Sequence, residues 1–155
     1  MNPSRTFHVV SELDAVPGVI GEITAFCNEL GIGGEELMMI ELCLAEAVNN
    51  AIEHAYRLEA GHAVEIVVGL RASDDLLSID VRDCGRAMPT DRLIAELKDL
   101  DPTDIDALPE RGMGLAILRR AMDALSYASD GGVNTLTLTK RVHRTDLENE
   151  HDQAC

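Results

Sequence analysis

Residues 46–54 read E-A-V-N-N-A-I-E-H and lie inside a longer helical pattern. This pattern predicts a helix from Glu35 to about Tyr56, because apolar residues recur at the spacing of one helical face: Leu37, Ile40, Leu44, Val48, Ala51 and Ala55. Two consecutive asparagines in mid-helix disfavour that helix. Glu46 and Asn50 lie one turn apart on a flank of the apolar stripe, where an acid and an amide can share one site. An ordinary solvated helix face is the alternative interpretation.

The rest of the chain alternates between strand and helix patterns. In chain order the predicted elements are a strand over residues 6–10, a helix over residues 15–30 capped by Gly31, the central helix, hairpin strands over residues 64–70 and 77–81, a helix from residue 112 to about residue 125, and strands over residues 125–128 and 133–142. Residues 84–111 are proline-rich and acidic, which is typical of a mobile excursion. This order predicts an α/β two-layer sandwich, with helices on one face of a mixed, mostly antiparallel sheet.

Composition limits the class of protein. The chain has 155 residues, of which 46% are apolar and 3% aromatic, which predicts one domain over residues 1–143 with an aliphatic core and a polar tail over residues 144–155. A net charge of −15 without basic clusters argues against nucleic-acid binding. The sequence shows neither a long apolar run nor a signal-peptide pattern, so we expect a cytoplasmic protein without membrane contact.

The four cysteines are widely spaced. Neither a zinc-ligand pattern nor a disulfide framework fits this spacing. We expect reduced cysteines, two of them in the core.

Two further segments carry polar chemistry. Strand alternation places Asp83 on the inward face, where an ionised carboxylate needs specific hydrogen-bond donors, such as the amino group of a ligand. Alternatively, the strand ends at Val81 and Asp83 is a solvated turn residue. Gly85 permits a close backbone approach or a positive φ. The run Arg111-Gly112-Met113-Gly114 opens a predicted helix, whose exposed amides suit phosphate oxygens, although glycines also serve plain turns.

In this order and at these separations, the three segments resemble the N box and the two glycine boxes of the GHKL ATPase superfamily. The wording of residues 46–56 and the R-G-M-G-L run are most similar to its branch of anti-sigma-factor serine kinases. The resemblance covers roughly residues 6–142. The chain departs from the family pattern in two places: Ala87 stands where the first glycine box usually has a second glycine, and Asn134, followed by Thr135, stands where the last strand often has a threonine.

The resemblance implies a Bergerat-type ATPase fold that binds ATP and Mg²⁺. It assigns Glu46 as the general base for an incoming serine hydroxyl and Asn50 as the Mg²⁺ ligand. It makes Asp83 the acceptor for the adenine amino group, with the base lying against Gly85. The other residues that it places around the nucleotide are Ala87, Arg111, Gly112, Met113, Gly114, Asn134 and Thr135, and residues 86–111 would close as a lid. His54 also matches the family wording, and we interpret it as structural.

The resemblance further implies an ATP-dependent protein serine kinase. Its partners would be an antagonist of the anti-anti-sigma (STAS) type, which it phosphorylates, and a sigma factor or similar target, which it sequesters; self-association as a homodimer is also expected. Two alternatives share the same residues. One is a nucleotide-gated binding module without significant phosphotransfer, and the other is slow ATP hydrolysis with water as the acceptor.

Overall fold

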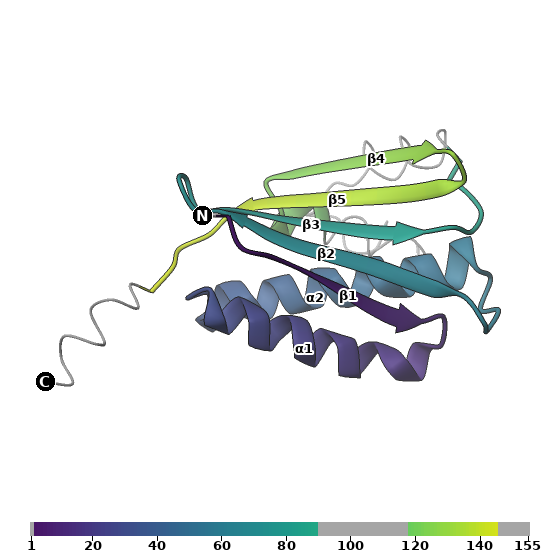
Figure 1. Cartoon of the computed structure of the whole chain (residues 1–155), viewed down its shortest axis with the longest axis horizontal. Helices are drawn as coiled ribbons and strands as arrows, with labels where there is room; N and C mark the ends of the chain where they lie inside the picture. Colours follow the sequence, from purple (N-terminus) through teal and green to yellow (C-terminus); the bar gives the residue numbers. More distant parts are fainter. Residues whose placement is uncertain (1, 90–117, 146–155) are drawn as a thin grey trace, which may run out of the picture.

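The structure, a computed structural model, describes residues 2–89 and 118–145. It shows a five-stranded sheet with two helices packed on one face, as Figure 1 shows, which confirms the predicted two-layer sandwich. The elements are β1 (Ser4–Val10), η1 (Leu13–Ala15), α1 (Val16–Glu29), α2 (Gly34–Asn50), η2 (Ala51–Ala55), β2 (Ala63–Arg71), β3 (Leu76–Asp83), β4 (Ala124–Asp130) and β5 (Val133–Arg141). The strand order is β1-β2-β3-β5-β4, and every pairing within the described residues is antiparallel.

The β2–β3 hairpin forms as predicted because apolar residues alternate along both strands. Its inward side chains are all buried: Val64, Ile66, Val68, Leu70, Leu77, Ile79 and Val81. The hairpin turn ends at Asp75, which adopts a left-handed φ of 53°. β5 then inserts between β3 and β4, so that Asp83 at the end of β3 pairs with Asn134 near the start of β5. Residues far apart in sequence therefore meet at one end of the sheet.

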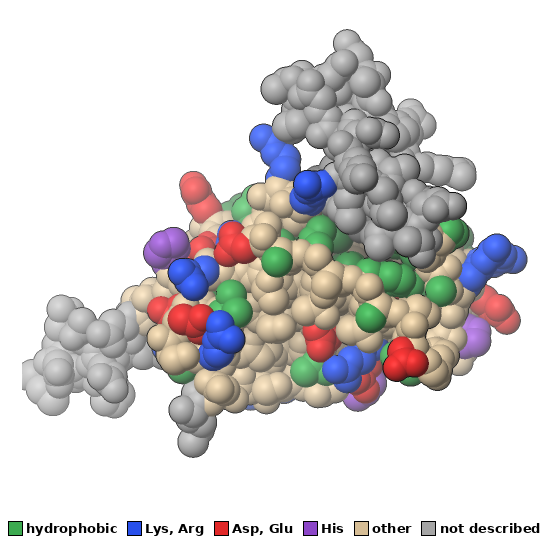
Figure 2. All heavy atoms as spheres, turned by 90° about the horizontal axis from the view of Figure 1, so that it is seen from above, with side chains coloured by type: hydrophobic (Ala, Val, Ile, Leu, Met, Phe, Trp, Pro, Cys, Tyr) green, Lys and Arg blue, Asp and Glu red, His purple; other side chains and the backbone are tan. Residues whose placement is uncertain are grey.

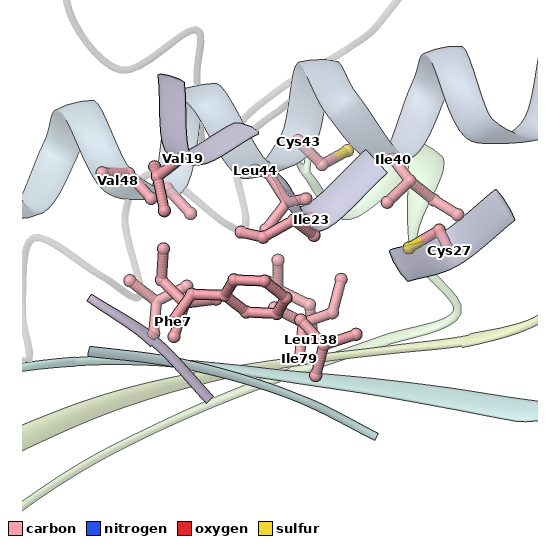
Figure 3. Close-up of a cluster of buried hydrophobic side chains, with 14 of the residues drawn as sticks. Phe7, Val19, Ile23, Cys27, Ile40, Cys43, Leu44, Val48, Ile79 and Leu138 are labelled. Carbon is pink, nitrogen blue, oxygen red and sulfur yellow. The ribbon is translucent and has the colours of Figure 1, made fainter. Parts of the chain in front are cut away.

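The core lies between the helices and the sheet and is aliphatic, as predicted. Figure 3 shows Val19 and Ile23 of α1 and Leu44 and Val48 of α2 facing Phe7 and the sheet. Two of the cysteines, Cys27 and Cys43, belong to this core as free thiols, which confirms their predicted place. Burial raises the pKa of each thiol to about 11, so both stay neutral near pH 7. Cys84 is free and exposed.

The central helix ends differently from the prediction. α2 stops at Asn50 and continues as η2, one turn of π-helix in which Tyr56 N–H donates to Ala51 O at 3.1 Å. The chain then leaves the helix through two left-handed residues, Arg57 and Leu58, with φ of 51° and 62°. Such single π turns inside helices occur frequently at functional sites. This turn lies directly after the two asparagines.

The C-terminal end of the described chain packs against the loop between α1 and α2. Thr145 N–H donates to Gly31 O at 2.8 Å, and a Cβ on Gly31 would meet Thr145 O at the same distance. Gly31 has a φ of +88°, which confirms the predicted helix cap. The described chain extends to residue 145, two residues past the predicted boundary, and the rest of the predicted tail lies outside the described residues.

Residues 90–111 of the predicted excursion and the first six residues of the predicted third helix, 112–117, also lie outside the described residues. Residues 118–121 are helical, and Leu118, Ala121 and Met122 are buried. In Figure 2 the acidic and basic side chains are interspersed over the face in view rather than separated into patches of one sign. The part of the chain that the structure describes contains no helix whose length and apolar character would let it cross a bilayer.

Candidate functional site

A cavity of about 360 Å³ opens between the C-terminal half of the central helix and the sheet. Its lining comes from α2 and η2, from β3, β4 and β5, and from residues 86–89: Ala47, Asn50, Ala51, Glu53, His54, Ala55, Arg57, Val81, Asp83, Arg86, Ala87, Met88, Pro89, Tyr127 and Leu136. This volume is typical of small-molecule sites. The cavity brings together three of the predicted site residues, namely Asn50, Asp83 and Ala87.

Asp83 is the buried acid of the cavity, with 8% of its surface exposed. Strand β3 runs through it, so the alternative of a solvated turn residue is wrong. Within the described residues, both hydrogen bonds to its side chain end on Oδ1, from Gly85 N–H at 3.0 Å and from Asn134 Nδ2 at 2.7 Å. Oδ2 receives no hydrogen bond from the described residues. Burial raises the pKa of this carboxyl, and the hydrogen bonds from Asn134 and Gly85 counteract that rise.

Asn134 supports Asp83 from β5 and does not line the cavity. Its Nδ2 also donates to Gly85 O at 3.0 Å, and its Oδ1 accepts from Ser129 Oγ at 2.7 Å. Two acceptors around Nδ2 fix the orientation of the amide. The neighbouring Thr135 pairs with Arg82 and lies on the opposite sheet face by strand alternation. The structure therefore places neither predicted residue in the cavity lining, and Asn134 contacts Asp83 instead.

Gly85 has a close backbone approach, as predicted, and the neighbour that it approaches is the end of η2. A Cβ at this position would lie 2.4 Å from Ala55 O and 2.9 Å from Tyr56 Cδ1. Next to it, Arg86 N–H donates to Ala55 O at 2.9 Å. The absence of a side chain lets the loop after β3 pack directly on the end of η2.

The crowding around Gly85 predicts a clear cost for any side chain there. We expect Gly85→Ala to lower the free energy of unfolding by roughly 2 kcal/mol or more, because the methyl group would overlap rigid backbone. Denaturant unfolding at equilibrium measures this change. Gly21→Ala in α1 is the matched control, since a Cβ there has no neighbour within 4 Å and alanine favours a helix. Equal stability changes in the two variants would contradict the described packing.

Glu46 and Asn50 lie as the helical spacing predicts. Asn50 is the last residue of α2 and lines the cavity, while Glu46, half-buried, lies one turn earlier and outside the cavity lining. A turn of helix separates the two by about 6 Å along the axis. The predicted phosphate site lies outside the described residues. It comprises Arg111, Gly112, Met113 and Gly114.

Several cavity residues were not predicted as ligand contacts, among them His54, Arg57, Arg86 and Tyr127. His54, which we interpreted as structural, is exposed and lines the cavity. Arg57 and Arg86 add positive charge to the cavity lining, and Tyr127 comes from the edge strand β4. His54 is part of the sequence motif that resembles the family, whereas no local sequence pattern predicts that Arg57, Arg86 and Tyr127 line a cavity.

Three comparisons place the chain among known proteins. Residues 9–140 match the family described as the histidine kinase-like ATPase domain. The serine-protein kinase RsbW of Bacillus cereus is 30% identical over 124 residues, which cover 79% of this chain and 75% of that relative, and RsbW of Bacillus mycoides matches at the same level.

Solved structures agree on the fold. The RsbU and RsbW domains of a Mycobacterium tuberculosis protein superpose with a TM-score of 0.65 at 19% identity, covering 92% of this chain and 33% of that one. The SiaB–SiaC complex of Pseudomonas aeruginosa gives a TM-score of 0.60 at 15% identity, covering 88% of each chain. The cavity between helix and sheet, the matched family over most of the chain and the related serine-protein kinases lead to one conclusion: this chain belongs to the family of histidine kinase-like ATPase domains.

Proposed function

We propose that this chain is an ATP-dependent protein serine kinase of the anti-sigma-factor type. It phosphorylates an antagonist of the STAS type and sequesters a sigma factor or a similar target, acting in the cytoplasm, where ATP and such targets are found. The observation that carries the proposal is the buried carboxylate of Asp83, which lines the same cavity as Asn50 and accepts hydrogen bonds from Asn134 and Gly85. The similarity to RsbW serine-protein kinases supports the choice of protein serine as the acceptor.

The cavity suits an adenine nucleotide. The carboxylate of Asp83 can accept from the adenine amino group, and Val81, Tyr127 and Leu136 offer an apolar surface for the ring. Arg57 and Arg86 line the same cavity. They act at contact distance, whereas the more distant acids of this protein are screened beyond roughly 8 Å. The net charge of −15 is therefore compatible with binding an anionic nucleotide.

Mg²⁺ fits the donor set at Asn50. Within residues 2–89 and 118–145, no cluster of three His, Cys, Asp or Glu side chains could hold a metal ion by itself. Mg²⁺ commonly takes few protein ligands and completes its shell with water and substrate phosphates, so one amide oxygen is sufficient. Bound there, the ion would neutralise charge on the phosphates.

Glu46 is the proposed general base, one turn from Asn50 on the same helix. As the serine oxygen attacks the γ-phosphorus, Glu46 accepts the hydroxyl proton, the new O–P bond forms and the bond to the β–γ bridging oxygen breaks. ADP is the leaving group. Positioning of the two reactants supplies most of the acceleration in reactions of this kind.

Incubation of the full chain with γ-labelled ATP, with and without a purified candidate STAS partner, tests the function. We expect label on a serine of the partner. Free phosphate without protein label would indicate an ATPase, and nucleotide binding without either product would indicate a nucleotide-gated binding module. Both outcomes would contradict the kinase proposal.

The role of Asn50 has its own test. We expect Asn50→Ala to weaken ATP binding by about 10-fold when Mg²⁺ is present and only slightly when EDTA is present, because the variant loses a metal ligand and little else. Calorimetric titration with ATP in both buffers measures the difference. Asn49→Ala, one residue earlier and not in the cavity lining, is the control. An equal loss of affinity in both buffers would exclude Asn50 as a metal ligand.

A further inference from the structure

The two tyrosines of this chain, Tyr56 and Tyr127, both end on one loop. The loop comprises residues 84–89 and is called the site loop here, because four of its residues line the cavity. From the helix side, the Tyr56 hydroxyl accepts from Cys84 N–H at 2.8 Å and donates to Ala63 O at 2.7 Å. From the edge strand, the Tyr127 hydroxyl accepts from Met88 N–H at 2.8 Å. The site loop is thus held at both ends by phenol oxygens.

These hydroxyls connect the two layers around the cavity. Tyr56 follows η2, which continues the helix that carries Asn50, and Tyr127 lies on β4 beside Leu136. Between the two anchor points, Arg86 N–H donates to Ala55 O at 2.9 Å. The backbone of the site loop is therefore fixed relative to both the helix and the sheet before any ligand enters.

We infer that Tyr56 and Tyr127 are positioning residues for nucleotide binding, holding the site loop as a preformed wall of the cavity. This inference rests on the proposed function and adds to it a role for two hydroxyl groups, which act through the loop and are separate from the apolar surface of the Tyr127 ring. When a binding-competent loop is only partly populated, the apparent affinity falls by that fraction. Anchors that keep the loop in place remove this loss.

The hydroxyl groups of the tyrosines, more than their rings, anchor the site loop. The Tyr56 ring is buried, stacks on His62 with centroids 4.6 Å apart and lies against the Cα side of Gly85. Phenylalanine can keep these ring contacts. Burial raises the pKa of Tyr56, so its hydroxyl stays protonated and able to donate to Ala63 O. A change of Tyr to Phe therefore removes the loop anchor and leaves the surrounding packing.

The kinetic test uses Tyr56→Phe, Tyr127→Phe and the double variant. One lost hydrogen bond corresponds to roughly a 5-fold rise in the KM for ATP, and the double variant should approach the product of the two effects. The kcat at saturating ATP should stay within about 2-fold, because bound nucleotide restores the loop. Thr137→Val is the matched control: it removes a 2.8 Å hydroxyl bond to Asp80 on the outer sheet face and should leave the KM unchanged.

Amide hydrogen exchange without nucleotide tests the anchors directly. We expect protection of the Cys84 and Met88 amides in the wild type, loss at Cys84 in Tyr56→Phe and loss at Met88 in Tyr127→Phe. Unchanged exchange, or an unchanged KM in both variants of a chain that binds ATP, would overturn the inference alone. A wild-type chain that binds no ATP, with exchange as expected, would overturn the proposed function as well. If Tyr56→Phe fails to fold, Tyr127→Phe still decides the question.

Discussion

Glu46→Gln is expected to reduce phosphotransfer to the partner serine by at least 100-fold while changing ATP affinity by less than about 3-fold. The amide keeps the size of the carboxylate but cannot accept the serine proton, and general-base catalysis typically contributes this much or more. Glu46 lies outside the lining of the cavity, so binding should not depend on its charge. Label transfer under single-turnover conditions, together with calorimetric ATP titration, separates the two quantities.

The matched control for this variant is Glu53→Gln. Glu53 is exposed, lines the cavity and follows Asn50 in the sequence, whereas Glu46 precedes it. Both side chains are carboxylates. Its neutralisation should leave transfer nearly unchanged if proton acceptance belongs to Glu46. Transfer at the normal rate by Glu46→Gln would show that another group, or none, acts as the base.

Asp83→Asn is expected to weaken ATP binding by roughly 100-fold or more. The introduced Oδ1 can still accept from Asn134 and Gly85, so the amide nitrogen takes the place of Oδ2 and presents N–H to the adenine amino group. A charge-assisted bond is lost and two donors face each other. ITP carries a carbonyl oxygen where ATP has the adenine amino group, so the substitution should reduce its affinity less than that of ATP. The ratio of ATP affinity to ITP affinity, compared between the variant and the wild type, measures this difference.

The same variant should be at least as stable as the wild type without nucleotide. The folded-state pKa of Asp83 is raised, mainly by burial, so its contribution to stability is present at low pH and lost as pH rises through that pKa. Asparagine has no charge to bury. Thermal unfolding from acid to neutral pH should therefore show the Asp83→Asn chain gaining relative to wild type. A loss of both binding and stability in this variant would mean that Asp83 is a structural residue.

Elements with a clear local period could be predicted from the sequence. The hairpin of β2 and β3 follows from strict alternation, and alternation alone placed Asp83 on the inward face, where the structure finds it. The one-turn relation of Glu46 and Asn50 follows from helix geometry. These predictions depend only on residues that lie close together in the sequence.

Features that depend on long-range pairing could not be predicted in this way. The bond from Asn134 to Asp83 depends on the register between β3 and β5, which no local pattern reveals. The clash that excludes a side chain at Gly85 comes from Ala55, in another element. The π turn escaped prediction because the apolar stripe of the helix continues through residues 51–55 without a break. The lining by Arg57 and Arg86 depends on where the chain leaves that turn.

The late insertion of β5 into the sheet has a consequence for biosynthesis. During translation β1, β2 and β3 are made first, and Asp83 leaves the ribosome 51 residues before its partner Asn134. Until β5 arrives, the acid lacks its side-chain donor Asn134 and the inner edge of β3 is open to pairing with other chains. Nascent polypeptides that stall between these strands should therefore be unable to recognise nucleotide, and they should depend more than the finished protein on chaperones.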